Sequence, residues 1–552
     1  MELLSVNERI NYLRKMAKQQ LDLFVIGGGI TGAGIAWDAS VRGMKVGLVD
    51  MNDFASGTSS RSTKLIHGGL RYLKQGEIRL VQEVGRERAL LHKSTPYLVD
   101  PIPMMLPIYK KGTYGYFASM IGLYVYDWLA GVKRSERRKM YGRTQTMLLE
   151  PLFKTDGLKG SGYYYEYRTD DARLTVEIMK SAVKSGSIVS NYAKVTDFIY
   201  RENRIVGVRV EDRLSGEQFE IYAKKIVNAA GPWVDELRKI DHSLQGKHLL
   251  LTKGIHLVVD AKRLPINQAA YFDVPDGRMI FAIPRGTKTY IGTTDTVYKG
   301  NPEEPHISTE DRQYVIDAVN EAFPSVNLTV SDIESGWSGL RPLVHEEGKS
   351  PSEVSRKDEM FISERGLITI AGGKLTGFRK MAEKVVNLVS SQLRDEEGRI
   401  FPPCTTDREC ISGGIAQGSE TFEQNRARMI GAGKTYGMTE SQVLDLLTRY
   451  GTNVEHIYEY VSTLQQESTS RQSLADQVLT AEIRYAVEYE MAAMACDFLL
   501  RRTGWILFDR SKAERVLNAV LRLMGQLLEW DQNETNKQRL EVEKQLQLAV
   551  GQ

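Results

Sequence analysis

One stretch near the start of the chain, residues 21–50, constrains the fold more than any other. It reads LDLFVIGGGITGAGIAWDASVRGMKVGLVD: an apolar run, a glycine turn, an alanine-rich segment with helical character, and a second apolar run. This order predicts a strand, a helix and a second strand in a βαβ unit. Gly27, Gly29 and Gly32 satisfy the pattern GxGxxG, which allows a tight turn, close approach of a pyrophosphate and close helix packing.

Asp50 ends the second predicted strand, at about the distance where a carboxylate accepts a hydrogen bond from a ribose hydroxyl,. The N-terminus of the predicted helix offers free N–H groups to phosphates. A glycine-rich turn without a ligand does not explain Asp50, so the sequence predicts a dinucleotide site.

The fingerprint alone does not separate FAD from NAD, because both cofactors use it. Two later segments, VNAAGPW (227–233) and IAGGKLTGFRK (370–380), each end a strand in small residues and then begin a helix. A flavin extends across the sheet, and a helix N-terminus can stabilise negative charge on the reduced ring. Together the two segments favour FAD.

The chain is 552 residues long and exceeds the about 250–300 residues that one hydrophobic core supports, so several domains are expected,. Alternating valines at 206, 208 and 210, followed by Phe219 and Ile221, predict a hairpin that leads into another strand,. The residues after Pro403 contain no proline and are rich in helix formers, which predicts a helical domain from about residue 400,. Residues 473–504 are a long example, with Gly504 as the expected stop.

Composition excludes several classes of protein. The net charge of +3 gives no support to a general nucleic-acid binder,. Three cysteines without CxxC spacing make a disulfide framework or zinc knuckle a poor interpretation and favour a reducing cytoplasm,. Histidines and cysteines are too scattered for a metal site, and we predict no metal. The charged N-terminal segment does not read as a secretion signal.

Eight motifs in order carry a resemblance to a known family. They are VIGGGITGAGIAWDASVRG, SSRSTKLIHGGLRYL, DDARL, NAAGPWVDEL, KGIHLVV, IGTTDT, SGLRPLV and GGKLTGFRKMAE. The chain resembles the FAD-dependent, respiratory glycerol-3-phosphate dehydrogenases over nearly all of residues 20–385. Asp50 stands where FAD fingerprints often have glutamate, which is chemically equivalent for a ribose contact. Gly377 and Phe378 stand where relatives often carry a polar residue and an aromatic one, which loosens the placement of side chains near Lys374.

The resemblance implies an α/β fold in which a Rossmann-like FAD-binding domain is interleaved with a mixed-sheet substrate domain, as in amino-acid oxidases. A mostly α-helical C-terminal domain follows. The expected FAD-binding parts are about 20–95, 155–235 and 335–395, and the substrate-binding parts are about 96–154 and 236–334. The helical domain is expected at 401–552.

The family reaction oxidises sn-glycerol 3-phosphate to dihydroxyacetone phosphate, with hydride transfer to FAD and electron transfer to a membrane quinone in glycerol catabolism. The resemblance therefore implies peripheral attachment to the inner face of the cell membrane and allows a homodimer. The segment 112–139 is aromatic-rich and ends in the basic cluster Lys133, Arg134, Arg137, Arg138 and Lys139. That combination suits an interfacial element on anionic lipid, and its alternative is a buried helix beside a solvated charge run.

The site residues are assigned within the family motifs. Arg71 and Arg341 are expected to hold the substrate phosphate, because a planar guanidinium donates two bonds to phosphate oxygens, and Tyr72 is a neutral donor. His67 is our first choice for the base that removes the hydroxyl proton, and His256 is the second. Lys374 is expected to stabilise the developing alkoxide or hold the phosphate. The expected FAD contacts are Gly27, Gly29, Gly32, Asp50, Thr58, Ser59, Thr63, Val195, Ala230, Gly231, Gly373, Leu375 and Thr376.

Three other functions stay open. A glycerol-3-phosphate oxidase shares the site and passes electrons to oxygen, although such family members usually carry an extra insertion that is not found here. A flavin oxidase or dehydrogenase of an amino or 2-hydroxy acid needs a carboxylate clamp. A non-catalytic nucleotide-binding sensor leaves the His, Arg, Tyr and Lys residues of the motifs without a purpose.

Overall fold

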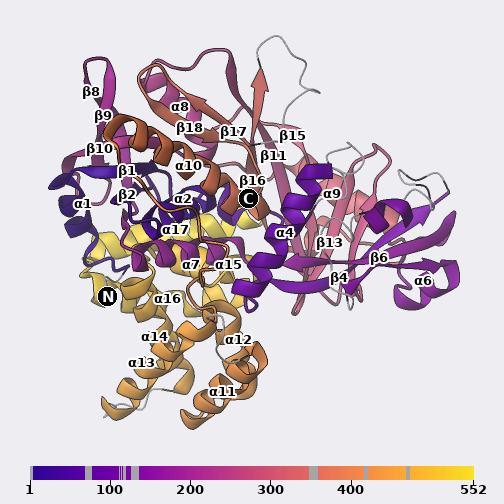
Figure 1. Cartoon of the computed structure of the whole chain (residues 1–552). Helices are drawn as coiled ribbons and strands as arrows, with labels where there is room; N and C mark the ends of the chain where they lie inside the picture. The colour runs from indigo at the N-terminus through magenta and orange to yellow at the C-terminus, as the bar shows by residue number, and fades with distance from the viewer. Residues whose placement is uncertain are drawn as a thin grey trace.

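The computed structural model describes residues 4–68, 78–110, 112, 115, 120–125, 136–346, 358–415, 421–467 and 473–551. Over these ranges the chain forms a largely parallel sheet, a mixed sheet and a block of C-terminal helices, which is orange to yellow in Figure 1. The predicted fold class is therefore confirmed: a Rossmann-like domain, an interleaved mixed-sheet domain and a helical C-terminal domain.

The first sheet has eight strands within the described ranges, in the order β17-β18-β10-β1-β2-β7, with β8 and β9 attached beside β10. They are β1 (Leu21–Ile26), β2 (Val46–Val49), β7 (Ile188–Ser190), β8 (Ala193–Arg201), β9 (Arg204–Asp212), β10 (Gln218–Asn228), β17 (Glu359–Ile362) and β18 (Leu367–Ala371). Strands β18, β10, β1, β2 and β7 run parallel. The hairpin predicted from the alternating valines is confirmed, since β9 pairs antiparallel with β10 and Val208 lies opposite Ile221.

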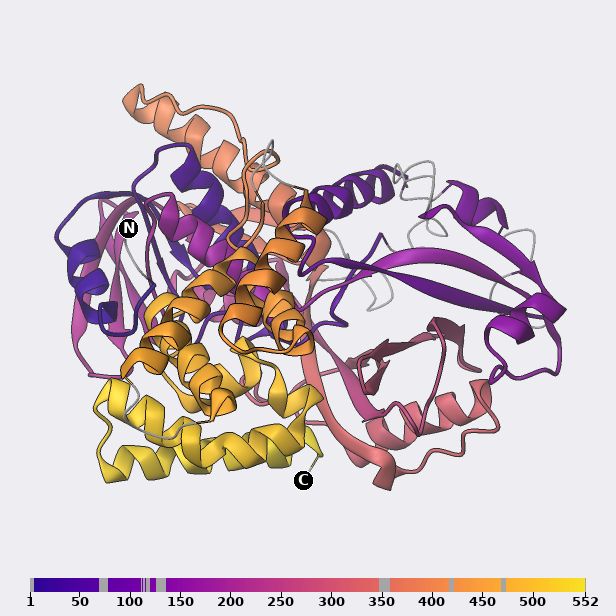
Figure 2. The same ribbon diagram turned by 90° about the horizontal axis from the view of Figure 1, so that it is seen from below.

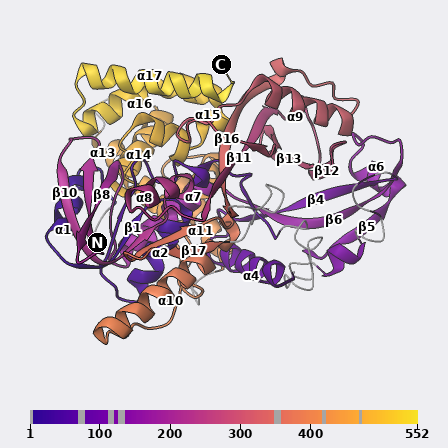
Figure 3. The same ribbon diagram turned by 90° about the horizontal axis from the view of Figure 1, so that it is seen from above.

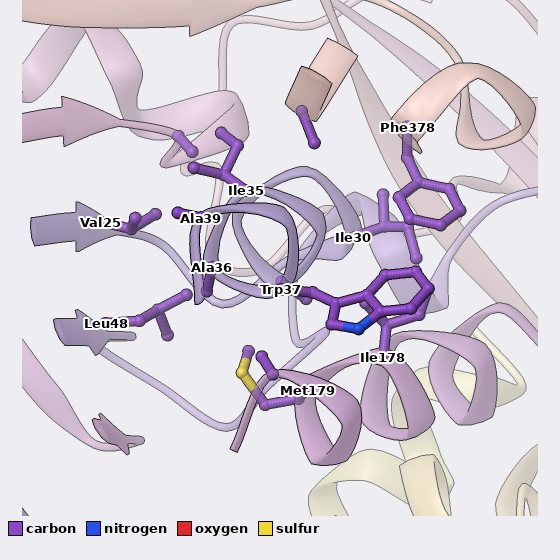
Figure 4. Close-up of a cluster of buried hydrophobic side chains, with 14 of the residues drawn as sticks. Val25, Ile30, Ile35, Ala36, Trp37, Ala39, Leu48, Ile178, Met179 and Phe378 are labelled. Carbon is purple, nitrogen blue, oxygen red and sulfur yellow. The ribbon is translucent and has the colours of Figure 1, made fainter. Parts of the chain in front are cut away.

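Helices cover one face of this sheet. They are α2 (Ile30–Val41), α7 (Asp171–Lys184) and α10 (Phe378–Glu397). Figure 4 shows α2 in the middle of this layer, with Trp37 beside α7 and Phe378 reaching in from α10. Strand β1 is buried at every position because β8 and β9 cover the opposite face. A strand buried on both faces reads as a continuous apolar run, which is how residues 21–26 appear in the sequence,.

The second sheet has ten strands in the described part of the chain, in the order β15-β11-β14-β13-β12-β4-β6-β3, with β16 beside β11 and β5 beside β6. They are β3 (Leu65–Ile66), β4 (Asp100–Tyr109), β5 (Lys139–Gly142), β6 (Leu158–Arg168), β11 (Lys247–Asp260), β12 (Ala269–Asp273), β13 (Met279–Arg285), β14 (Lys288–Gly292), β15 (Thr296–Val297) and β16 (Ile333–Glu346). Only the pair β12–β4 is parallel among these strands, so the sheet is mixed. Helix α9 (Thr309–Ala322) packs on one face. The strands β4 and β6 extend, together with the short helix α6, to the end of the molecule farthest from α1 (Figure 3).

Four more helices lie before Pro403 in the described ranges. Helix α1 (Arg9–Ala17) precedes β1, α4 (Ile78–Ser94) and α6 (Arg143–Leu149) join strands of the mixed sheet, and α8 (Val234–Ile240) leads from β10 to β11. The C-terminal domain contains α11 (Phe422–Thr435), α12 (Glu440–Tyr450), α13 (Val454–Glu467), α14 (Leu474–Tyr489), a π-helix (Asp497–Arg502), α15 (Trp505–Phe508), α16 (Arg510–Leu528) and α17 (Gln532–Ala549). These helices lie against the parallel-sheet half and the near part of the mixed sheet (Figure 2). None of the described helices is both long and apolar enough to span a bilayer.

Residues 473–504, which are rich in helix formers throughout, do not form one continuous helix. Helix α14 ends at Tyr489, and a π-helix begins only at Asp497. The chain leaves the helix because the backbone carbonyl of Glu490 accepts hydrogen bonds from Arg502, while Asp497 accepts from the N–H groups of Ala493 and Met494. The expected stop is in place, since Gly504 has a φ of +69° and lies in the left-handed region,.

Candidate functional site

The glycine turn after β1 has no room for side chains. A Cβ on Gly27 would lie 2.6 Å from the carbonyl oxygen of Ala229, and Gly27 has a φ of +109°. A Cβ on Gly32 would lie 1.8 Å from the carbonyl oxygen of Gly27, so this position keeps α2 close to the turn. Gly29 is the N-cap of α2, and the next N–H, that of Ile30, donates to Ser59 Oγ at 2.9 Å. These are the features that a pyrophosphate cradle needs.

Asp50 follows β2 and belongs to the same turn. Its carboxylate accepts hydrogen bonds from the N–H of Gly28 at 2.6 Å and from the N–H of Asn52 at 2.8 Å. Burial raises the pKa of Asp50 to about 6, against the effect of these two bonds. A carboxylate held in this way at the edge of a cavity suits a hydroxyl donor such as a ribose.

A cavity of about 400 Å³ runs from Asp50 past both later glycine passages. Most of the predicted cofactor residues line it: Gly27, Gly29, Asp50, Thr58, Ser59, Val195, Ala230, Gly231, Gly373 and Leu375. Lys374 lines the same cavity. The other predicted contacts, Gly32, Thr63 and Thr376, are not among the residues that line this cavity, and they stay predictions; Gly32 packs on the Gly27 carbonyl, and the two threonines lie within hydrogen-bond distance of His256 and His67.

The shape and chemistry of this cavity fit FAD. One end offers the glycine turn and a carboxylate, and the other end brings in residues before α10, where Gly372 and Gly373 have φ values of +77° and +82°. Glycines with such backbone angles let the chain pass close to a flat ring without a side chain in the way. Of the residues that line the cavity, Thr58, Ser59, Val195, Gly231 and Leu375 would hold the cofactor along its length.

His67 lies where β3 ends, beside the start of α10. The backbone N–H of His67 donates to Thr376 Oγ1 at 3.2 Å, and the Thr376 hydroxyl can donate to the backbone carbonyl of His67 at 3.3 Å. Burial, together with the positive charges of Lys374 and Arg88, lowers the pKa of His67 to about 3. The imidazole is therefore neutral at physiological pH, and an unprotonated ring nitrogen can accept a hydrogen bond from a hydroxyl group.

His256 forms a second group on β11. Its Nε2 lies 3.0 Å from Thr63 Oγ1, and its ring stacks on Trp337 with centroids 4.7 Å apart. Burial, with the charges of Arg341 and Lys64, holds the pKa of His256 well below its usual range. The Nδ1 atom is buried without a hydrogen-bond partner among the described residues. This histidine is also neutral, but it is more enclosed than His67.

Arg341 projects from β16 toward the same group. Its guanidinium donates to Thr293 Oγ1 at 3.1 Å, to the Thr294 carbonyl at 3.2 Å and to Asp295 Oδ1 at 3.3 Å. The side chain is 31% exposed, so these bonds orient a cation that solvent still reaches. A Cβ on Gly254 would lie 2.4 Å from Arg341 Nη2, which explains why a glycine precedes the segment IHLVV.

The structure thus brings the predicted residues together in two groups. His67, Thr376 and Lys374 form one group beside the cavity, and His256 of β11, Arg341 of the paired strand β16 and Thr63 form the other. Residues 63–67 run from one group to the other. Arg71 and Tyr72, the other two predicted substrate contacts, lie outside the described residues.

The ion pair of Lys64 with Asp171 is a feature that sequence reasoning missed. Lys64 Nζ lies 2.5 Å from Asp171 Oδ1, and the side chains are 3% and 0% exposed. Asp171 Oδ2 also accepts from the N–H of Ser62 at 3.0 Å and from its hydroxyl at 2.6 Å. Asp171 belongs to the motif DDARL, but the sequence of a motif does not show which residue a charged side chain pairs with. The ion pair fixes the segment 63–67, which connects the group around His67 with the group around His256.

Comparisons with known proteins agree with this geometry. A family model described as "FAD dependent oxidoreductase" matches residues 22–379, and one described as "C-terminal domain of alpha-glycerophosphate oxidase" matches residues 404–535. A protein named "Aerobic glycerol-3-phosphate dehydrogenase" from Bacillus subtilis (strain 168) is 53% identical over 543 residues, 98% of each chain. A relative of the same name from Staphylococcus haemolyticus (strain JCSC1435) is 49% identical over 539 residues, 97% of this chain and 95% of the relative.

Solved structures extend the likeness to three dimensions. A glycerol-3-phosphate dehydrogenase from Bacillus halodurans, complexed with FAD, superposes with a TM-score of 0.85 at 44% identity and covers 99% of both chains. The L-alpha-glycerophosphate oxidase from Mycoplasma pneumoniae, with FAD bound, is 15% identical with a TM-score of 0.55, over 70% of this chain and 97% of that one. The second likeness shows a shared fold alone.

Proposed function

This chain belongs to the family of FAD-dependent aerobic glycerol-3-phosphate dehydrogenases, and from that premise we propose that it oxidises sn-glycerol 3-phosphate to dihydroxyacetone phosphate. The observation that carries the proposal is the segment 63–67, which joins a cavity that fits FAD to two neutral histidines and the cations Lys374 and Arg341. A small phosphorylated alcohol needs this combination of fixed positive charge and proton acceptor.

The bound FAD supplies the hydride acceptor, and the protein supplies position and proton transfer. Arg341 binds the substrate phosphate, because Thr293, Thr294 and Asp295 fix the plane of its guanidinium,. Lys374 lies at the cavity and stabilises negative charge on the substrate oxygen,.

His67 accepts the proton of the C2 hydroxyl. One observation favours it over His256: its backbone is held by Thr376 at the cavity end of α10, next to Lys374, which lines the cavity. Nε2 of His256 is occupied by the Thr63 hydroxyl, and the ring is stacked on Trp337. We therefore assign His256 a structural role next to the substrate-binding residues and not proton transfer. The family motif further suggests Arg71 and Tyr72 as ligands of the substrate phosphate.

The same proposal passes the electrons to a membrane quinone, and the alternative acceptor is oxygen. The enzyme would then work in the cytoplasm, attached peripherally to the inner face of the membrane, as a monomer or homodimer. Support for a membrane contact comes from the described part of the segment 112–139. There Ile121 and Tyr124 are each 59% exposed, and the guanidinium of Arg138 lies 4.5 Å from the centre of the Tyr124 ring. Apolar side chains beside basic ones suit an anionic lipid surface.

Anaerobic rapid mixing of the purified protein with glycerol 3-phosphate tests the reaction. We expect the flavin absorbance to bleach with this substrate and to persist with glycine or lactate, which have a carboxylate in place of the phosphate. His67→Asn should slow flavin reduction at saturating substrate, whereas Arg341→Ala should mainly raise the substrate concentration required. A flavin that glycerol 3-phosphate leaves oxidised refutes the proposed function, and an unchanged rate in His67→Asn refutes only the base assignment.

The acceptor and the membrane contact need their own measurements. Turnover with a soluble quinone analogue and no hydrogen peroxide supports the dehydrogenase, while stoichiometric peroxide without added acceptor supports the oxidase. Replacing Arg137, Arg138 and Lys139 by glutamine should reduce sedimentation with anionic vesicles. Equal sedimentation of parent and variant places the membrane contact elsewhere.

A further inference from the structure

A buried group of charges joins the C-terminal domain to the dinucleotide site. It consists of Asp53, Glu490, Asp497, Arg501 and Arg502, and we refer to it as the Asp53 cluster. Asp53, Glu490, Asp497 and Arg502 are each 0% exposed. Burying charges is costly unless each is paired, so such a group marks a contact that the fold keeps closed.

Asp53 is held by both arginines of the π-helix. Arg502 binds it through two parallel bonds, Nη1 to Oδ2 at 2.7 Å and Nη2 to Oδ1 at 2.8 Å. Arg501 Nε donates to Oδ2 at 2.5 Å, and the amide of Asn191 donates to Oδ1 at 3.1 Å. Although burial raises it, the charges of these arginines lower the pKa of Asp53 to about 2, so the carboxylate is ionised throughout the physiological range.

The C-terminal side of the cluster is equally constrained. Arg501 also binds Asp497, which accepts from the hydroxyl of Tyr192 at 2.7 Å. Arg502 donates to the carbonyl of Glu490 at 2.7 Å. The π-helix permits this arrangement, because it turns two consecutive arginines toward one carboxylate,.

Asp53 lies in the loop that forms the adenosine end of the dinucleotide cavity. Asp50 begins this loop, and Ala55 N–H donates to the Gly28 carbonyl at 3.1 Å. A Cβ on Gly28 would lie 2.5 Å from Phe54 Cδ1, so the loop packs directly against the glycine turn. The loop continues into Thr58 and Ser59, which line the cavity. Displacement of Asp53 therefore displaces residues on both sides of it that face the cofactor.

We propose that the C-terminal domain is part of the FAD site: Arg501 and Arg502 are positioning residues that hold the loop 50–55, through Asp53, in the conformation that binds FAD. Docking of the domain and binding of FAD are then coupled, and by linkage each strengthens the other. The inference rests on the proposed function only in taking this cavity as the FAD site and Asp50 as the ribose ligand.

The test measures FAD binding by the full-length protein after removal of its flavin, with flavin fluorescence as the signal. The variants are Asp53→Asn, which keeps the shape and removes the charge, and Arg502→Lys, which keeps the charge and removes the two-pronged contact. Arg502→Lys is the milder change, so the test does not depend on folding of the Asn variant. The matched control is Ser335→Ala, which removes the buried bond of Ser335 Oγ to the Leu507 carbonyl at another C-terminal-domain contact.

We expect the dissociation constant of FAD to rise at least about fivefold in both cluster variants, and by less than about twofold in Ser335→Ala. Hydrogen exchange of residues 50–57 in the FAD-bound protein should accelerate in the cluster variants alone. At saturating FAD, the KM for glycerol 3-phosphate should stay at the parent value, since the loop 50–55 contains none of the proposed substrate residues His67, His256, Arg341 and Lys374.

Two results overturn the inference. One is FAD binding by Arg502→Lys and Asp53→Asn within about twofold of the parent, below the coupling expected between linked sites. The other is an equal loss of FAD affinity in Ser335→Ala, which would mean that any weakening of the contact with the C-terminal domain lowers FAD affinity by lowering overall stability. A parent protein that binds FAD but is not reduced by glycerol 3-phosphate refutes the proposed function and leaves this inference standing.

Discussion

The buried pair of Lys64 and Asp171 gives the sharpest stability prediction. Lys64→Met removes the ammonium and leaves the Asp171 carboxylate, 0% exposed, with hydrogen bonds from Ser62 and its own neighbours but no countercharge. Removing one partner of a buried pair typically costs roughly 3–5 kcal/mol, because the remaining charge is desolvated without compensation. We expect the free energy of unfolding to fall by about that amount.

The double variant separates the pair from the loss of packing. Lys64→Met with Asp171→Asn leaves no unpaired buried charge, so the cost of the two changes together should be less than their sum by about 1 kcal/mol or more. A surface pair provides the control: Arg14 and Glu217 lie 3.0 Å apart but are 49% and 41% exposed. Arg14→Met should change the free energy of unfolding by less than about 1 kcal/mol.

Urea unfolding of the FAD-saturated protein at neutral pH measures these differences, with far-UV circular dichroism and flavin fluorescence as parallel signals. The midpoints are compared at equal slope, so that a change in the unfolded state is not mistaken for a change in stability. A Lys64→Met variant within about 1 kcal/mol of the parent would refute the reasoning. Strict additivity in the double variant would refute it as well, because it would mean that the two charges do not interact.

Three further predictions follow from single positions. Gly32→Ala should yield protein with little bound flavin but unchanged C-terminal helices by circular dichroism, because its Cβ would lie 1.8 Å from the Gly27 carbonyl; normal flavin content contradicts this. Gly254→Ala should raise the KM for glycerol 3-phosphate and leave flavin content intact, since its Cβ would displace the Arg341 guanidinium; an unchanged KM would show that this guanidinium does not contact substrate. Ionised Asp53 stabilises the fold above the ordinary pKa of 3.8, and this contribution is lost as the pH falls toward the folded-state pKa of about 2,. The stability deficit of Asp53→Asn in urea titrations should therefore shrink between those two pH values, and a deficit independent of pH contradicts it.

Local patterns predicted the backbone of the dinucleotide site well. The strand, turn and helix at 21–41 follow from a continuous apolar run and glycines whose roles are steric, and the structure has β1, Gly27 and α2 in those places. Asp50 was predictable for the same reason, because it stands at a set distance from the turn. The hairpin of β9 and β10 was predictable from alternation alone.

Side-chain partners were less predictable than the backbone. The contact of the Thr63 hydroxyl with Nε2 of His256, at 3.0 Å, joins residues 193 positions apart and has no local signal in the sequence. The break after Tyr489 was not foreseen, because residues 473–504 have helical composition throughout. At the interruption, besides the bonds of Arg502 and Asp497, Arg173 binds the Glu490 carboxylate at 2.6 and 2.7 Å from 317 positions earlier in the chain. Helix propensity is a local quantity and contains no information on such contacts.

The start of α7 shows why charges that look redundant in the sequence have separate purposes. Asp170 accepts from Arg285 of the mixed sheet at 3.2 Å, Asp171 binds Lys64 at 2.5 Å, and Arg173 binds Glu490 of the C-terminal domain. The helix turns each successive side chain by about 100°, so residues this close in sequence face three different parts of the molecule. A shift of α7 would therefore move the segment 63–67 and the Asp53 cluster together. Asp170, Asp171 and Arg173 together hold the mixed sheet, the segment 63–67 and the C-terminal domain in fixed positions around the start of α7, whereas any one of these charges contacts only one of those parts.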